Sequence, residues 1–121
     1  MQPKLKQAVR LFNRRAYFDS HQVLEEAWHE ADTADKTFYE ALIRLATGLH
    51  MRFNRGGSQG AINLLTQALM RLEDFRPSSH GIDVARLYRD IDAHVADLKA
   101  DEKPKPGFFE RWKVPRIYAT D

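Results

Sequence analysis

The stretch YFDSHQVLEEAWHEA, residues 17–31, decides the fold class of this chain. At about 100° per residue, its apolar side chains gather on one side of a helical wheel and most of its acidic side chains on the other. His21 and Glu25 lie inside the apolar stripe, between Trp28 and Phe18. The stretch therefore predicts an amphipathic helix that buries the pattern His21-x-x-x-Glu25-x-x-Trp28 against its neighbours.

Four further helical segments follow from hydrophobic period and from Gly and Pro punctuation. Short connections between helices favour antiparallel packing. A weak internal repeat, FNRR at residues 12–15 and FNRG at 53–56, indicates two similar helical units. We therefore predict an all-α fold, a five-helix bundle of two stacked antiparallel helical hairpins plus a covering helix. The helices are expected at about residues 3–14, 17–31, 35–53, 58–75 and 82–100, with Asp35 and Ser58 as N-caps of the third and fourth.

The last segment of the chain differs from the helical part. Three prolines, Pro104, Pro106 and Pro115, exclude a long helix there, and five large apolar residues make it too hydrophobic for a free linker. We predict one helical domain over residues 1–102 and an irregular, aromatic and basic tail over 103–121 that folds back on it. A partner interface is the alternative role for this tail, and a homodimer is compatible with it.

Composition narrows the class of protein. The 121 residues are 43% hydrophobic and include no Cys, which excludes disulfides and thiolate zinc sites. No stretch resembles a signal peptide or a membrane span, so a soluble, cytoplasmic protein without a membrane partner is expected. The net charge is only +2, and acids and bases alternate along the first hundred residues. This pattern argues against nucleic-acid binding, for which only the locally basic tail is a candidate.

The candidate site is a cluster of His21, Glu25, Trp28 and His50. His21 and Glu25 are one helical turn apart, so their side chains can touch or share a ligand. If the second and third helices pack antiparallel, His50 near the end of one approaches the start of the other. The cluster can be a buried hydrogen-bond network that fixes helix register. It can also bind a divalent metal through His21, Glu25 and His50, perform acid–base catalysis, or hold a small polar ligand.

Two blocks of sequence, in order, resemble a known family. Residues 12–28, FNRRAYFDSHQVLEEAW, carry the pattern HxxxExxW that marks DUF309, an uncharacterised bacterial and archaeal helical family. Residues 38–65, FYEALIRLATGLHMRFNRGGSQGAINLL, are similar to its second block, with His50, Asn54, Gly60-Ala61 and Leu64-Leu65 at the matching places. The resemblance implies an all-helical fold and no known substrate. Glu40 departs from the pattern, where Gln is expected.

No complete catalytic motif accompanies the stripe, so the chain is not expected to be an enzyme. The sequence favours a non-enzymatic helical binding or scaffold module in which a buried His21, Glu25 and Trp28 cluster organises the hairpin. A metal-binding protein, including a metal-dependent hydrolase, that uses His21, Glu25 and His50 is the first alternative. A weak nucleic-acid binder acting through the basic tail is the second.

Overall fold

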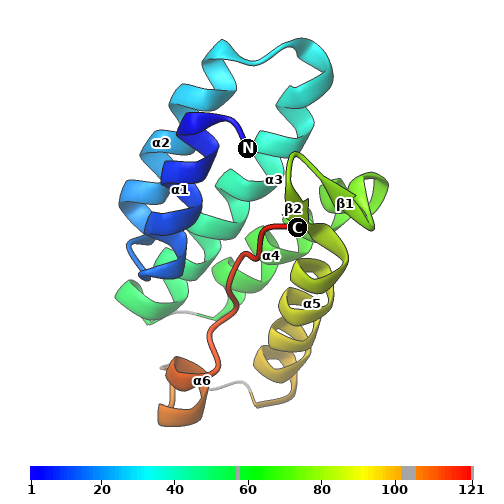
Figure 1. Ribbon diagram of the computed structural model, residues 1–121. Helices are drawn as coiled ribbons and strands as arrows, with labels where there is room; N and C mark the ends of the chain where they lie inside the picture. Colours follow the sequence, from blue (N-terminus) through cyan, green and yellow to red (C-terminus); the bar gives the residue numbers. More distant parts are fainter. Residues whose placement is uncertain (57, 102–105, 121) are drawn as a thin grey trace.

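The computed structural model describes residues 1–56, 58–101 and 106–120, and most of them are helical. Consecutive helices pack side by side. Figure 1 shows α1 and α2 at one edge, α5 at the other, and α3 and α4 between them. The helices are α1 (Pro3–Asn13), α2 (Tyr17–Glu30), α3 (Thr33–His50), α4 (Gln59–Leu72), α5 (Val84–Asp101) and α6 (Phe108–Trp112). Shorter elements are the π-helical turn η1 (Met51–Arg55), the 3-10 helix η2 (Glu73–Phe75), and strands β1 (Ser78–Ser79) and β2 (Ile82–Asp83).

The predicted helical fold is confirmed in its coarse form, with two corrections. A sixth helix, α6, and a two-stranded hairpin were not predicted. The hairpin forms because His80 and Gly81 both have positive φ, 55° and 79°, as a tight type I′ connection requires. The N-cap of α3 is Asp32 rather than Asp35, and Ser58 occupies the N-cap of α4 without a side-chain bond.

The core is built around α3, which is covered on both sides by α2 and α4. Its buried residues therefore surround much of the helix rather than forming a narrow stripe. α3 and α4 approach closely at Gly48, where an added Cβ would lie 3.0 Å from Leu65 Cδ2. The fully buried residues of α3 include Phe38, Ala41, Leu42, Leu45, Ala46 and Leu49.

The connection from α1 to α2 is tight and sets where α2 begins. Arg15 has a left-handed backbone, with φ 65°. Its N–H donates to Phe12 O at 2.9 Å, and the N–H of Ala16 donates to Leu11 O at 2.9 Å. These two bonds form a Schellman motif, whose left-handed position is usually glycine. The chain therefore reverses at Arg15, and Tyr17 starts α2 against the end of α1.

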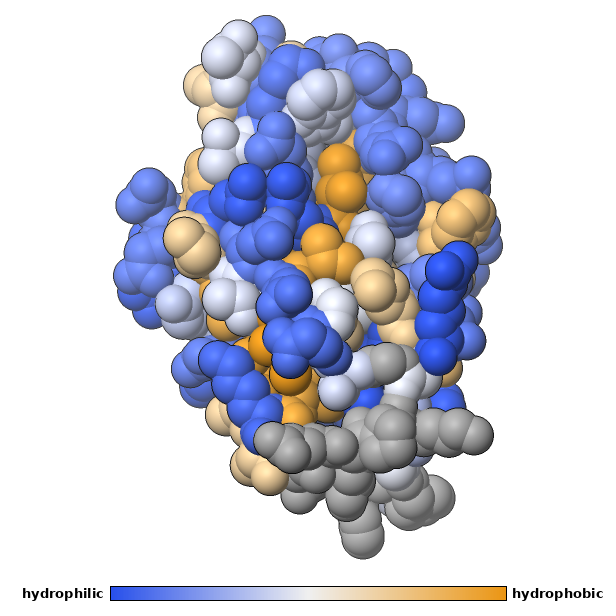
Figure 2. Space-filling model, turned by 180° about the vertical axis from the view of Figure 1, so that it is seen from behind, coloured by the Kyte–Doolittle hydropathy of each residue, from blue (hydrophilic) through white to orange (hydrophobic). Residues whose placement is uncertain are grey.

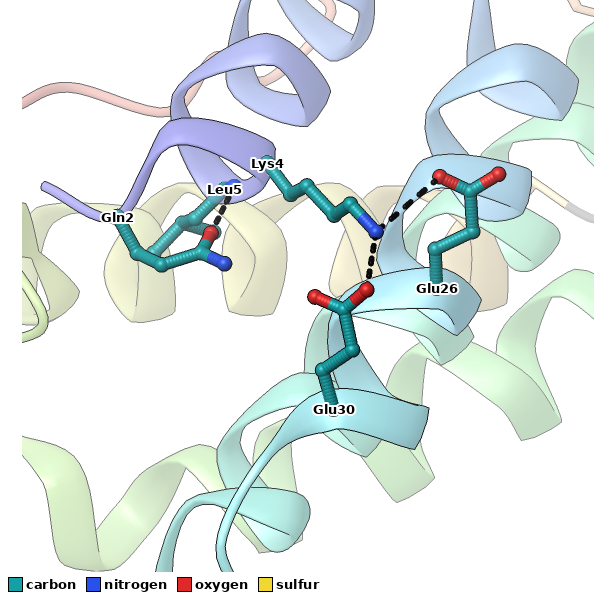
Figure 3. Close-up of polar contacts among 5 residues, drawn as sticks. All are labelled: Gln2, Lys4, Leu5, Glu26 and Glu30. Atoms are coloured by element: carbon teal, nitrogen blue, oxygen red, sulfur yellow. Dashed lines mark hydrogen bonds and ion pairs between the residues drawn. The ribbon is translucent and has the colours of Figure 1, made fainter.

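Polar contacts also fasten α1 to α2. Ser20 Oγ donates to the buried carbonyl oxygen of Ala8 at 2.8 Å. Nearer the other end, the Lys4 ammonium lies between the carboxylates of Glu26 and Glu30 (Figure 3). The hydrogen bond that Lys4 donates to Glu30 is the main reason why the pKa of Lys4 is raised. In the same view the Gln2 side chain caps α1 by accepting from the N–H of Leu5.

The C-terminal segment packs against the helices. Figure 1 shows it running from α6 between α1 and α5 towards the hairpin. The Asn13 side chain holds it through two 2.8 Å bonds, one to the carbonyl oxygen and one to the N–H of Ile117. Tyr118 O accepts from the Asp83 N–H at 2.8 Å, and Ala119 forms a bridge with Ile82. The predicted boundary near residues 102–103 lies outside the described residues.

The surface of the described residues is mixed. Figure 2, viewed from behind, shows a band where hydrophobic residues reach the surface between hydrophilic ones. No helix in the part of the chain that the structure describes is both long and apolar enough to cross a membrane. The most exposed large hydrophobic residues are Met1, Phe18, Met70 and Trp112.

Candidate functional site

His21 and Glu25 pair on α2, with His21 Nε2 2.8 Å from Glu25 Oε1. The prediction that this pair is buried is wrong, because the side chains are 26% and 54% exposed. The buried stripe of α2 is centred on Ser20, Leu24 and Ala27, to which α1 and α3 are packed. His21 lies roughly 80° and Glu25 roughly 120° from the centre of that stripe. The pair therefore lies at the edge of the interface and is in contact with solvent.

Trp28 belongs to a separate group of contacts. Its Nε1–H donates to Glu40 Oε1 at 3.3 Å, and Glu40 Oε2 lies 3.5 Å from Arg71 Nε. The Lys36 ammonium lies 4.0 Å from the centre of the Trp28 ring and donates to the Trp28 carbonyl oxygen at 2.9 Å. The predicted single cluster of His21, Glu25 and Trp28 is thus divided, because Trp28 turns towards α3 while Glu25 faces solvent. Trp28 links α2 to α3.

His50, at the end of α3, lies against the start of α2. Its ring centre is 5.6 Å from that of Phe18, and the Phe18 ring is 6.3 Å from His21. His50 Nδ1 is buried and has no hydrogen-bond partner among the described residues. The Phe18 ring is thus a neighbour of both histidines. Within the described part of the chain, no three or more His, Asp or Glu side chains form a group that could hold a metal ion.

A pocket opens beside this end of α2 and α3, where the two FNR segments meet the C-terminal segment. Its volume is about 330 Å³, including the part open to solvent. Three elements contribute walls: the α1–α2 connection with the start of α2, the turn η1, and the segment around α6. The lining residues are Arg15, Tyr17, Phe53, Asn54, Arg111 and Val114.

The wall of the pocket contains a polar group that the protein leaves unsatisfied. Tyr17 is 2% exposed, and its Oη has no hydrogen-bond partner among the described residues. Burial raises the pKa of Tyr17 well above its usual value, and the nearby Arg15 charge opposes that shift only in part. A buried tyrosine hydroxyl normally finds a partner, because leaving it unpaired costs about 1–3 kcal/mol. Tyr17 therefore carries a neutral hydroxyl, buried behind the pocket wall, that the described residues leave without a partner.

Beneath α6, a buried ion pair fixes the C-terminal wall. Arg52, on η1, is 1% exposed, and its Nε and one terminal nitrogen each donate to Glu110 at 2.6 Å. Burial alone would raise the pKa of Glu110, but the hydrogen bond and charge of Arg52 outweigh it, so the pKa is lowered. Such two-pronged pairing fixes the orientation of both groups.

His94, on α5, adjoins this ion pair. Its Nε2 lies 3.3 Å from Glu110 Oε2, although the two atoms lack hydrogen-bond geometry. Burial lowers the pKa of His94, and Glu110 opposes the shift while Arg52 adds to it. His94 is therefore mainly neutral at pH 7. The three residues connect η1, α5 and α6 in a single buried polar group.

The pocket was not predicted from the sequence. Arg15, Phe53 and Asn54 belong to the FNRR and FNRG repeat, but periodicity alone could not show that the two copies face each other across a cavity. Arg111 and Val114 lie in the C-terminal segment, about which the resemblance said nothing. Two features of the sequence could have pointed to the pocket: Arg15, a residue other than glycine just after the end of α1, and Tyr17, the aromatic residue that begins α2.

Comparisons with known proteins agree with the two sequence blocks. A family model described as "Domain of unknown function (DUF309)" matches residues 5–64, the segment that contributes four of the six lining residues. A protein of Aquifex aeolicus (strain VF5), named "Uncharacterized protein", is 32% identical over 84 residues. That alignment covers 69% of this chain and 25% of the relative, so the chain spans about a quarter of that protein's length. The chain thus belongs to DUF309, a family whose function is unknown.

Proposed function

We propose that this protein is a non-enzymatic helical binding module whose ligand site is the pocket between the α1–α2 connection, η1 and α6. The observation that carries the proposal is the pocket itself, whose wall brings together three separate segments and includes Tyr17, a residue with a buried Oη that has no hydrogen-bond partner among the described residues. Ligand sites combine an apolar wall with a few polar groups that fix orientation. Phe53 and Val114 supply apolar wall here, and Arg15, Asn54 and Arg111 supply polar groups.

Binding rather than catalysis is favoured by the chemistry of the lining residues. An effective general acid or base has a pKa near the working pH. The described lining residues include no histidine, carboxylate, lysine or cysteine, and burial raises the pKa of Tyr17 further from neutral pH. The His21 and Glu25 pair lies outside this lining. Trp28 has the scaffold role in this proposal, because its contact with Glu40 ties α2 to α3.

A fragment screen by NMR on the full chain tests the site. Compounds that bind should shift the side-chain amide signals of Asn54 and leave those of Asn63, on the exposed face of α4, unchanged. Val114→Trp fills the pocket and should abolish the shifts, whereas the matched control Met70→Trp, on an exposed position, should retain them. Shifts that persist in Val114→Trp, or a screen without any hit at Asn54, would contradict the proposed function.

A further inference from the structure

The charge of the pocket indicates what kind of molecule it takes, provided that the proposed function holds. Two of the six lining residues, Arg15 and Arg111, carry a full positive charge, and the described lining contains no carboxylate. Both arginines are exposed, and neither side chain forms an ion pair with a described residue. Other surface arginines, such as Arg71 and Arg76, do have carboxylate partners. The pocket therefore has an unbalanced positive charge.

We infer that the pocket binds a small organic oxyanion, a carboxylate or a phosphate ester, between the guanidinium groups of Arg15 and Arg111. Guanidinium groups bind these anions through paired, charge-assisted hydrogen bonds.

Both arginines are attached to rigid parts of the chain. Arg15 occupies the left-handed position of the Schellman motif, so two backbone hydrogen bonds fix its Cα. Arg111 follows Glu110, which buried Arg52 holds through two 2.6 Å bonds. Donors whose backbone is already ordered lose less entropy when a ligand binds. The backbone that carries the two positive groups is therefore ordered before an anion arrives.

The remaining wall favours a flat or short apolar group next to the anionic one. The Phe53 and Tyr17 rings are stacked, with centres 6.3 Å apart and planes inclined by 24°. The Arg111 guanidinium carbon lies 5.8 Å from the centre of the Phe53 ring, so charge and aromatic surface are adjacent. The part of the pocket that a water-sized sphere can enter is about 100 Å³, which is smaller than most ligand pockets and limits the ligand to a small molecule.

Calorimetric titration of the full chain with four probes tests the inference: benzoate, its neutral isostere benzamide, phenyl phosphate and inorganic phosphate. Benzoate or phenyl phosphate should bind about tenfold or more tightly than benzamide, because charge-assisted hydrogen bonds are about twice as strong as neutral ones. The tighter of the two identifies the oxyanion as a carboxylate or a phosphate. Inorganic phosphate should bind more weakly than phenyl phosphate, because it lacks the apolar group.

Variants locate the binding. Arg15→Gln and Arg111→Gln should each weaken binding of the tighter organic anion by about tenfold. Arg14→Gln, which removes an equally exposed charge that does not line the pocket, should leave affinity unchanged. Equal weakening by Arg14→Gln would mean non-specific charge attraction and would overturn the inference. Benzamide binding as tightly as benzoate would overturn the inference alone. If none of the probes shifted the Asn54 amide signals in the NMR experiment, that result would also count against the proposed function.

Discussion

Replacing Arg15 with glycine should stabilise the fold and weaken anion binding at the same time. The backbone of Arg15 is left-handed, which costs a residue with a Cβ about 1–2 kcal/mol. Glycine avoids this cost but adds about 0.4–1 kcal/mol of flexibility to the unfolded chain. The net gain in unfolding free energy should be about 0.5–1 kcal/mol, which raises Tm by roughly 2–4 °C for a chain of this size.

Arg15→Ala is the matched control, since it removes the same guanidinium but keeps a Cβ in the left-handed conformation. Urea unfolding should therefore rank Arg15→Gly above Arg15→Ala by about 1 kcal/mol. Both variants should lose benzoate or phenyl phosphate affinity to the same extent, because the charge is absent from both. If the glycine variant were no more stable than the alanine variant, the left-handed backbone would not carry the assumed cost and the reasoning would be refuted.

Three more outcomes are expected. Tyr17→Phe should raise the unfolding free energy by about 1 kcal/mol in urea melts, because it removes a buried unpaired hydroxyl; a loss of stability would reveal a partner for that hydroxyl. The lowered pKa of His94 means that, below pH 6.5, the unfolded chain binds a proton that the folded chain resists, so stability falls as pH decreases from 6.5. His94→Gln should flatten this slope in urea midpoints measured between pH 7 and about pH 5, and an unchanged slope would exclude His94 as its source. His21→Ala should change the unfolding free energy by less than about 0.5 kcal/mol, as expected for a solvent-exposed ion pair, whereas Trp28→Ala should lower it by about 2–3 kcal/mol. Equal losses would indicate that His21 and Trp28 belong to one cluster after all.

Most helices could be predicted from the sequence because their signals are local. The apolar period of residues 35–53 indicated α3, and the prolines after Asp101 indicated the end of α5. The short elements could not be predicted in the same way. The β1–β2 hairpin depends on a positive φ at His80, and the side chain of His80 is held by Phe38 and Asp35 from α3. Those contacts join residues that are far apart along the chain.

The candidate site was harder to predict for the same reason. The contact between His21 and Glu25 was found because residues one turn apart on a helix are neighbours. A helical wheel, however, gives the direction in which each side chain points but not which neighbouring helices cover it. It therefore could not show that α1 and α3 leave this pair at the edge of the interface. The pocket joins Arg15 to Arg111. No spacing rule connects these two residues, because their proximity depends on α6 and its buried ion pair.

The two bonds between the Asn13 side chain and the backbone of Ile117 have a consequence for how ligand binding could be observed. The pocket takes some lining residues from the α1–α2 connection and others from the C-terminal segment. A ligand that contacts both must therefore favour their association, and by linkage the association must favour the ligand to the same extent. The Ile117 amide, which opens only when that segment detaches from Asn13, should exchange its hydrogen more slowly once the pocket is filled. Hydrogen exchange at this single amide would then report occupancy of a site that it does not touch.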